Sequence, residues 1–190
     1  MRVLIACEFS GIVREAFRQQ GHDAWSCDLL PTELPGQHYQ GDVRDMLAPG
    51  NAWNLMIAFP PCTYLCRSGA RWHWGTPRQA EALEFVRYLM AQPMPWAIEN
   101  PVGAISSHIR KPDLIVQPWQ YGHRETKATC LWLHRLPPLM ATDVREGPFA
   151  ARVHKAPETR DRWKVRSRTL PGLAAAMAEQ WSHPVPARGV

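Results

Sequence analysis

Long apolar runs are missing from this sequence. The first seven residues contain only five consecutive apolar residues, at 3–7, before Glu8 interrupts them. A signal peptide needs a longer apolar run, and a membrane helix needs about 18 or more apolar residues. We therefore expect a soluble, cytoplasmic protein without a membrane partner. The 190 residues, 45% of them hydrophobic, suffice for one globular domain with its own core.

Cysteine is scarce, and its spacing excludes the common cysteine motifs. The five cysteines are an odd number, and none shows the Cys-x-x-Cys spacing of a zinc site or a redox dithiol. We expect reduced thiols and no metal site. Cys62 and Cys66 are four residues apart, which fits one face of a helix, but Pro60-Pro61 just before them favours a loop.

Basic residues outnumber acidic ones, and the excess of positive charge lies mainly in one segment. The chain has 22 Lys and Arg against 17 Asp and Glu, a formal net charge of +5. Between positions 134 and 168, nine basic residues face four acidic ones. The basic residues are Arg135, Arg145, Arg152, Lys155, Arg160, Arg162, Lys164, Arg166 and Arg168. Such a segment is either a solvated surface or a contact for a polyanion.

Short apolar segments alternate with helical patterns along the chain. Buried strands are predicted at 3–6, 24–27, 55–59, 96–98 and 129–133. Helices are predicted at 13–18, 76–90 and 173–181. This order predicts an α/β fold with a doubly wound, mostly parallel sheet. We expect the proline-containing segment 137–168 to be irregular.

Polar residues follow several of these strands. Glu8 to Gly11 follow the first strand, Asp28 the second, Pro60 to Cys62 a third, and Glu99-Asn100 a fourth. In an open parallel sheet, ligands bind outside the carboxyl ends of the strands. We therefore expect these residues to form one site.

Cys62 and Glu99 have complementary chemistry. Carbon 5 of cytosine is a poor nucleophile until another nucleophile adds to carbon 6, and a thiolate is suited to that addition. A carboxylic acid with a raised pKa, near ring nitrogen 3, offsets the negative charge that develops on the ring. Cys62 follows a rigid Pro-Pro turn, and Glu99 ends a neighbouring strand. A buried structural thiol is the alternative role for Cys62.

Two motifs resemble those of the DNA cytosine-5 methyltransferase family. Phe59-Pro60-Pro61-Cys62 resembles its catalytic Pro-Cys loop, and Glu99-Asn100-Pro101 resembles its Glu-Asn-Val motif, in the same order and with similar spacing. The resemblance implies a Rossmann-like, S-adenosylmethionine-dependent methyltransferase fold. It assigns Cys62 as the nucleophile, Glu99 to ring nitrogen 3, and Asn100 to fixing the loop.

The resemblance also implies a site for S-adenosylmethionine, which would leave as S-adenosylhomocysteine. Phe9-Ser10-Gly11 resembles the family's Phe-x-Gly turn at the cofactor, and Asp28 stands where an acidic residue binds the ribose. Gly41-Asp42-Val43 resembles the Gly-Asp-Ile motif that accepts from the adenine amino group. Leu29 would pack on the adenine, and Phe59 and Pro60 complete the implied cofactor site.

Downstream, the resemblance extends to about residue 181. Lys127 resembles the basic residue directed at the pyrimidine 2-oxo group, and 168–172 resembles the motif that closes the cofactor pocket. The phrases 98–103 and 127–133 are similar to those of compact members common in bacteriophages and prophages. This organisation implies a catalytic core at 1–133, a small basic segment at 134–167, and a returning C-terminal helix at 168–190.

Three features depart from the family pattern. Val13 stands where a second glycine is usual, and Glu125 stands where an arginine is usual. Only about forty residues separate Lys127 from the final motif, whereas the family inserts a large target-recognition domain there. Target selection would then depend on the small basic segment or on a protein partner.

The predicted activity is methylation of cytosine carbon 5 in DNA, on a flipped-out or single-stranded base. Predicted nucleic-acid contacts are Arg71, Arg124, Arg160, Arg162, Lys164 and Arg166. Arg71-Trp72-His73-Trp74 mixes cations with aromatics, and we expect a mobile loop there that covers the substrate. The alternatives are an enzyme that modifies a free pyrimidine nucleotide, a non-catalytic nucleic-acid-binding accessory protein, and transfer of a different alkyl group.

Overall fold

The computed structural model describes residues 1–149 and 162–182, which contain a seven-stranded mixed sheet. The strand order is β3-β2-β1-β4-β5-β7-β6. Strands β1 to β5 run parallel to one another, and β7 runs antiparallel to both β5 and β6. The strands are β1 Arg2–Ala6, β2 Asp23–Asp28, β3 His38–Gln40, β4 Leu55–Ala58, β5 Trp96–Pro101, β6 Leu114–Val116 and β7 Thr129–His134.

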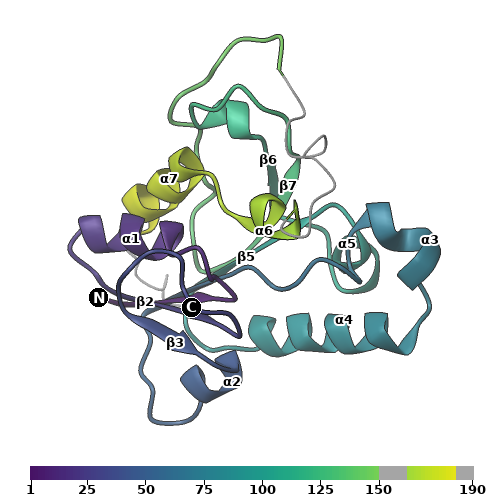
Figure 1. Cartoon of the computed structure of the whole chain (residues 1–190), viewed down its shortest axis with the longest axis horizontal. Coiled ribbons are helices and arrows are strands. Elements are labelled where there is room, and N and C mark those ends of the chain that lie inside the picture. Colours follow the sequence, from purple (N-terminus) through teal and green to yellow (C-terminus); the bar gives the residue numbers. More distant parts are fainter. Residues whose placement is uncertain (150–161, 183–190) are drawn as a thin grey trace, which may run out of the picture.

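Helices cover both faces of the sheet (Figure 1). One layer holds α1 and α7, whose apolar residues pack on one side of β1 and β4. The other layer holds α2, α4 and α5, which pack on the opposite side. The helices are α1 Ile12–Gln19, α2 Val43–Met46, η1 Arg67–Gly69, α3 Ala70–His73, α4 Pro77–Met90, α5 Ala104–His108, η2 Pro118–Gln120, α6 Arg162–Ser167 and α7 Pro171–Trp181.

The longest helix, α4, begins where its sequence predicts. Thr76 is the N-cap, its side chain accepts a hydrogen bond from the backbone N–H of Gln79, and Pro77 occupies the first turn. A proline is tolerated there because the first N–H groups of a helix have no partner within the helix. The central strands β1 and β4 are buried on both faces, which explains their uninterrupted apolar sequences.

The α/β class and the mostly parallel sheet between helical layers are confirmed. All five predicted strands and all three predicted helices are present, with ends that differ by a few residues. The prediction for 137–168 was wrong at its end, because Arg162–Ser167 forms α6. The short edge strands β3 and β6 and the helices α2, α3 and α5 were not predicted.

The strand order reverses direction between β1 and β4, because β2 and β3 extend to one side and β5 to the other. At such a switch point the connections leave the sheet on opposite faces and open a crevice at the carboxyl ends of the strands. Cys7 to Ser10 follow β1, and Phe59 to Cys62 follow β4. α7 packs against α1, which returns the described end of the chain to the core. No helix in the described ranges is long and apolar enough to cross a bilayer.

Candidate active site

A cavity of about 580 Å³ lies at the switch point. This volume is in the range of small-molecule and cofactor sites in proteins. Its walls come from the ends of β1, β2, β4 and β5, the residues just before β7, and α6. The residues at the ends of β1, β2, β4 and β5, which the sequence analysis identified one by one, therefore line a single cavity.

Most of the predicted catalytic and cofactor residues line this cavity. They are Cys62, Glu99, Lys127, Phe9, Ser10, Asp28, Phe59 and Pro60, and one predicted nucleic-acid contact, Arg166, joins them. Other predicted residues, all described by the structure, are not part of its lining: Asn100, Gly11, Leu29, Asp42, Arg71, Arg124, Arg162 and Lys164. Arg160 lies outside the described residues.

The loop that carries Cys62 is attached to the end of β5. The side-chain amide of Asn100 is buried and donates a hydrogen bond to the carbonyl of Pro60 at 2.8 Å. The backbone N–H of Ala104 donates to the carbonyl of Leu65 at 2.7 Å. A Cβ on Gly103 would lie 1.9 Å from that same carbonyl, so only glycine permits this approach. Asn100 does not line the cavity itself, but it holds the loop whose residues do.

Cys62 and Cys66 lie on one turn of the loop after β4, so the prediction of a loop rather than a helix is confirmed. The carbonyl of Cys62 accepts hydrogen bonds from the backbone N–H groups of Leu65 and Cys66. Both cysteines line the cavity, and their thiols interact with each other. A hydrogen bond from the Cys62 thiol lowers the pKa of Cys66 to about 5, and the Ser68 hydroxyl, 3.2 Å from Cys66 Sγ, supports the same shift.

The pKa of Cys62 is shifted in the opposite direction. The interaction with Cys66, burial, and the nearby negative charge of Glu99 all raise the pKa of Cys62, and Lys127 lowers it only in part. The two thiols therefore titrate as one pair, in which the direction of both shifts favours a Cys66 thiolate that accepts a hydrogen bond from Cys62. Sequence reasoning identified Cys62 but missed Cys66, whose role depends on the turn.

Glu99 meets the pKa requirement for a carboxylic acid that donates a proton. It lines the cavity, and desolvation by the surrounding protein raises the pKa of its carboxyl group. The Lys127 ammonium and the Thr129 side chain oppose that shift in part. Lys127 is held in place by a 3.0 Å hydrogen bond from its Nζ to the carbonyl of Arg166 in α6.

Glu8 is a buried site residue that sequence reasoning placed only within a turn. Its carboxylate accepts hydrogen bonds from the backbone N–H groups of Val13, at 2.7 Å, and Arg14, at 3.2 Å. The Ser10 hydroxyl donates to the same carboxylate at 3.0 Å. Burial raises the pKa of Glu8 although these donors lower it. The N-terminal amides of α1 are thus occupied by Glu8, at the position where Val13 departs from the family's glycine-rich turn.

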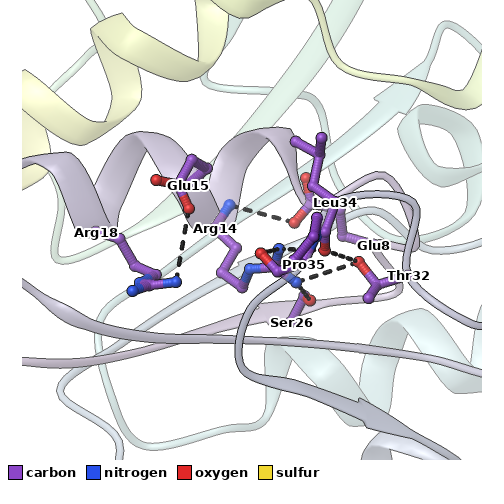
Figure 2. A network of polar contacts seen from close by, with 8 residues as sticks. All are labelled: Glu8, Arg14, Glu15, Arg18, Ser26, Thr32, Leu34 and Pro35. Carbon is purple, nitrogen blue, oxygen red and sulfur yellow. Dashed lines mark hydrogen bonds and ion pairs between the residues drawn. The ribbon is translucent and has the colours of Figure 1, made fainter.

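A buried arginine holds the segment after β2 (Figure 2). Arg14 is fully buried on α1, and its guanidinium donates to the hydroxyls of Ser26 and Thr32 and to the carbonyls of Leu34 and Pro35. These bonds are 2.7 to 3.2 Å long. The sequence signal was weak, because a charged residue in an amphipathic helix usually faces solvent.

The adenine end of the implied cofactor site differs from the family pattern. Asp28 lines the cavity, and its Oδ1 accepts from the backbone N–H of Leu30 at 3.0 Å. Leu29 is 73% exposed, and Leu30 rather than Leu29 lines the cavity. Asp42 caps α2 and forms an ion pair with Arg44 at 2.9 Å. Leu29 and Asp42 are not part of the cavity lining, and their roles at the cofactor stay predictions.

α6 closes one side of the cavity. The Trp163 ring lies 5.9 Å from the Phe9 ring, centroid to centroid, and both residues line the cavity. Arg168, just after α6, forms two 2.7 Å hydrogen bonds with the carboxylate of Glu33. The segments after β2 and α6 are therefore connected across the cavity. The basic segment contributes to the site through Trp163 and Arg166 as well as through its charge.

No protein-family model and no curated protein matches this sequence. Within the described ranges, no three His, Cys, Asp or Glu side chains form a group that could hold a metal ion. The cavity does bring together a thiol pair, a carboxyl group with a raised pKa and an ammonium. That set can perform nucleophilic addition to an electron-poor ring while protonating or hydrogen-bonding the ring.

Proposed function

We propose that the protein is an S-adenosylmethionine-dependent methyltransferase that acts on carbon 5 of cytosine in DNA, with Cys62 as the nucleophile. The observation that carries this proposal is that Cys62 and Glu99 line one cavity, while Asn100 binds the loop of Cys62 from the residue next to Glu99. A nucleophile and an acid must act on opposite parts of one ring, and this link fixes their separation.

The proton of Cys62 is transferred to Cys66. Above a pH of about 5 the Cys66 thiol is ionised, and the Cys62 thiol is its hydrogen-bond donor. As Cys62 Sγ forms its bond to carbon 6, its proton moves to Cys66 Sγ. The pair keeps one proton throughout the addition, so no isolated thiolate has to form on Cys62, whose pKa is raised.

Glu99 and Lys127 stabilise the cytosine ring. Burial raises the pKa of the Glu99 carboxyl group and so favours its protonated form, which donates a hydrogen bond to ring nitrogen 3 as negative charge develops there. The Lys127 ammonium lies near both Glu99 and Cys62 and donates to the 2-oxo group. After carbon 5 is alkylated, its proton leaves to water, and the Cys62 thiolate is eliminated and recovers a proton from Cys66.

The residues present fit S-adenosylmethionine at its ribose and methionine end. The aromatic rings of Phe9 and Phe59 and the carboxylate of Asp28 lie in the cavity that contains Cys62. When bound, this cofactor supplies an electrophilic methyl group. Asp28 would accept from the ribose hydroxyls, and Phe9 would supply an apolar wall, with Leu30 rather than Leu29 beside the adenine.

Covalent trapping tests the proposal. DNA containing 5-fluorocytosine, incubated with the protein and S-adenosylmethionine, should give a stable adduct, because fluorine at carbon 5 prevents the final elimination. Mass spectrometry should locate the adduct on Cys62. Cys62→Ser should form no adduct, and Cys27→Ala should form it, since Cys27 is buried in β2 outside the cavity lining.

The same experiment separates the alternatives. A wild-type protein that forms no adduct, although it binds the DNA and saturating cofactor, would contradict the proposed chemistry and favour an accessory binding protein. An adduct with a free 5-fluorocytosine nucleotide but none with DNA would favour the nucleotide-modifying enzyme. The added mass reports which alkyl group is transferred.

A further inference from the structure

The segment that follows Cys62 carries cations and aromatic rings without any acidic residue. Between positions 60 and 80 there are three arginines, at 67, 71 and 78, and no Asp or Glu. The nearest acidic residues in the sequence are Asp45 and Glu81. A surface of this composition attracts a polyanion and repels a basic protein or peptide.

The aromatic rings of this segment face solvent. Trp72 is 67% exposed and Trp74 is 43% exposed, whereas large aromatic side chains are usually buried. The Arg71 guanidinium carbon lies 4.4 Å from the centroid of the Trp72 ring. The expected mobile loop is wrong for these residues, because 70–73 form α3 and continue directly from η1.

Several contacts hold α3 in place. The rings of Tyr64 and His73 meet edge to face, with centroids 4.9 Å apart. Arg78, at the start of α4, donates to the Tyr64 hydroxyl at 3.3 Å. The Trp74 ring meets His108 at the end of α5, with centroids 6.2 Å apart. His73 in α3 and Trp74 just after it are therefore both held by ring contacts, and a surface held in this way loses little conformational freedom when it binds a ligand.

This surface begins at the rim of the cavity. Thr63, Ser68 and Gly69 line the cavity, and α3 starts at the next residue, Ala70. A Cβ on Gly69 would lie 3.0 Å from the His73 ring, so α3 packs closely on this rim. A strand whose target base enters the cavity would therefore place its neighbouring nucleotides on α3.

We propose that Arg71, Trp72 and Trp74 form a stacking platform for the nucleotides that flank the target base in a single-stranded polynucleotide. Single-strand-binding proteins combine exposed aromatic rings, on which bases stack, with cations that follow the backbone. Bases within a duplex already stack on each other and do not offer a free face. This inference depends on the proposed function only for the identity of the target base.

Binding is measured without turnover in the full-length Cys62→Ser protein. Fluorescence anisotropy would compare a labelled single-stranded oligonucleotide with its duplex and with cytidine monophosphate as competitor. The single strand should bind more tightly than the duplex. Adding Trp72→Ala should weaken single-strand binding about 5- to 150-fold, the range for loss of one stacked base. Trp72→Phe should restore most of it.

Matched exposed residues provide the controls. Met140 is also 67% exposed, and Met140→Ala should leave binding unchanged. Arg71→Ala should reduce the dependence of affinity on salt, since one phosphate contact is lost, whereas Arg18→Ala, on the outer surface of α1, should not. Circular dichroism of each variant confirms that the fold is retained.

Two results would overturn the platform: tighter binding of the duplex than of the single strand, or unchanged single-strand binding in Trp72→Ala. The outcomes for the proposed function are separate. If no 5-fluorocytosine adduct forms but Trp72→Ala weakens binding, the platform stands and the methyltransferase proposal fails. If the wild-type protein forms the adduct and Trp72→Ala leaves single-strand binding of the Cys62→Ser protein unchanged, the platform alone fails.

Discussion

The side-chain amide of Asn100 donates a 2.8 Å hydrogen bond to the carbonyl of Pro60, so the residue after Glu99 holds the loop of Cys62. The bond joins β5 to the loop that follows β4, its neighbour in the sheet, across forty positions in the sequence. The pairing of β4 with β5 therefore sets where the Cys62 thiol lies relative to the Glu99 carboxyl group. Four predictions concern the residues of this arrangement and its support.

Asn100→Asp should keep the shape of the side chain but lose the amide N–H group that donates to the Pro60 carbonyl. A carboxylate in place of the amide would repel the Pro60 carbonyl, and we expect adduct formation to slow by about 100-fold as the thiol is displaced. Stability should fall by about 1–3 kcal/mol. Asn54→Asp is the control, because Asn54 uses its Oδ1 as an acceptor for Arg2 N–H and Asp retains that acceptor. Stopped-flow trapping and chemical denaturation measure the two effects, and an unaltered trapping rate would show that the loop is positioned without Asn100.

Cys66→Ala should change the pH dependence of adduct formation. In the wild type, the Cys66 thiolate is present above a pH of about 5, so the rate should decline as the pH is lowered through that value. Without Cys66 the thiol of Cys62 must lose its proton to water, and the rate should be lower at pH 7 and rise toward alkaline pH. Identical profiles for wild type and Cys66→Ala would rule out Cys66 as the proton acceptor.

Glu99→Gln should abolish or strongly reduce activity while making the protein more stable. The pKa of Glu99 is raised in the folded state, so the stability that its protonated form supports is complete at acid pH and is lost as the pH rises through the folded-state pKa. Glutamine has no proton to lose. The stability advantage of Glu99→Gln should therefore be absent near pH 3 and grow toward neutral pH, by about 1.4 kcal/mol for each unit of pKa shift. Thermal unfolding across this pH range measures it; a constant difference would mean that Glu99 titrates normally.

Arg14→Met should be far more damaging than Arg18→Met, although both arginines lie on α1 (Figure 2). Removal of the Arg14 guanidinium takes one donor away from each of two hydroxyls and two carbonyls in a buried site, at a cost of about 2–4 kcal/mol. Arg18 pairs with Glu15 at the surface, and its loss should change stability by less than about 0.5 kcal/mol. Urea titration compares the two variants. Equal losses would contradict the assigned role of the Arg14 network.

Local patterns in the sequence were sufficient for the main elements of the sheet and its helical layers. The uninterrupted apolar runs of β1 and β4 and the helical period of α4 each need only neighbouring residues to be recognised. The positions of Cys62 and Glu99 at strand ends follow from the same patterns, because the carboxyl ends of parallel strands share one edge. The short strands β3 and β6 were missed because three residues carry too little periodicity.

The pairing of distant side chains was decided only by the tertiary structure. Local sequence does not show that Glu8 caps α1, that Arg14 turns inward to bind the segment after β2, or that Trp163 meets Phe9. The contacts of Arg14 and Trp163 join residues far apart in the chain, and those of Glu8 depend on the turn that brings its carboxylate back to the start of α1. The shifted pKa values of Cys66 and Glu99 have the same origin. The sequence by itself determined which chemical groups follow the strands. Only the tertiary structure decided that Cys62 and Cys66 share a proton and that the pKa of Glu99 is raised, because pKa shifts depend on burial and on distances in space.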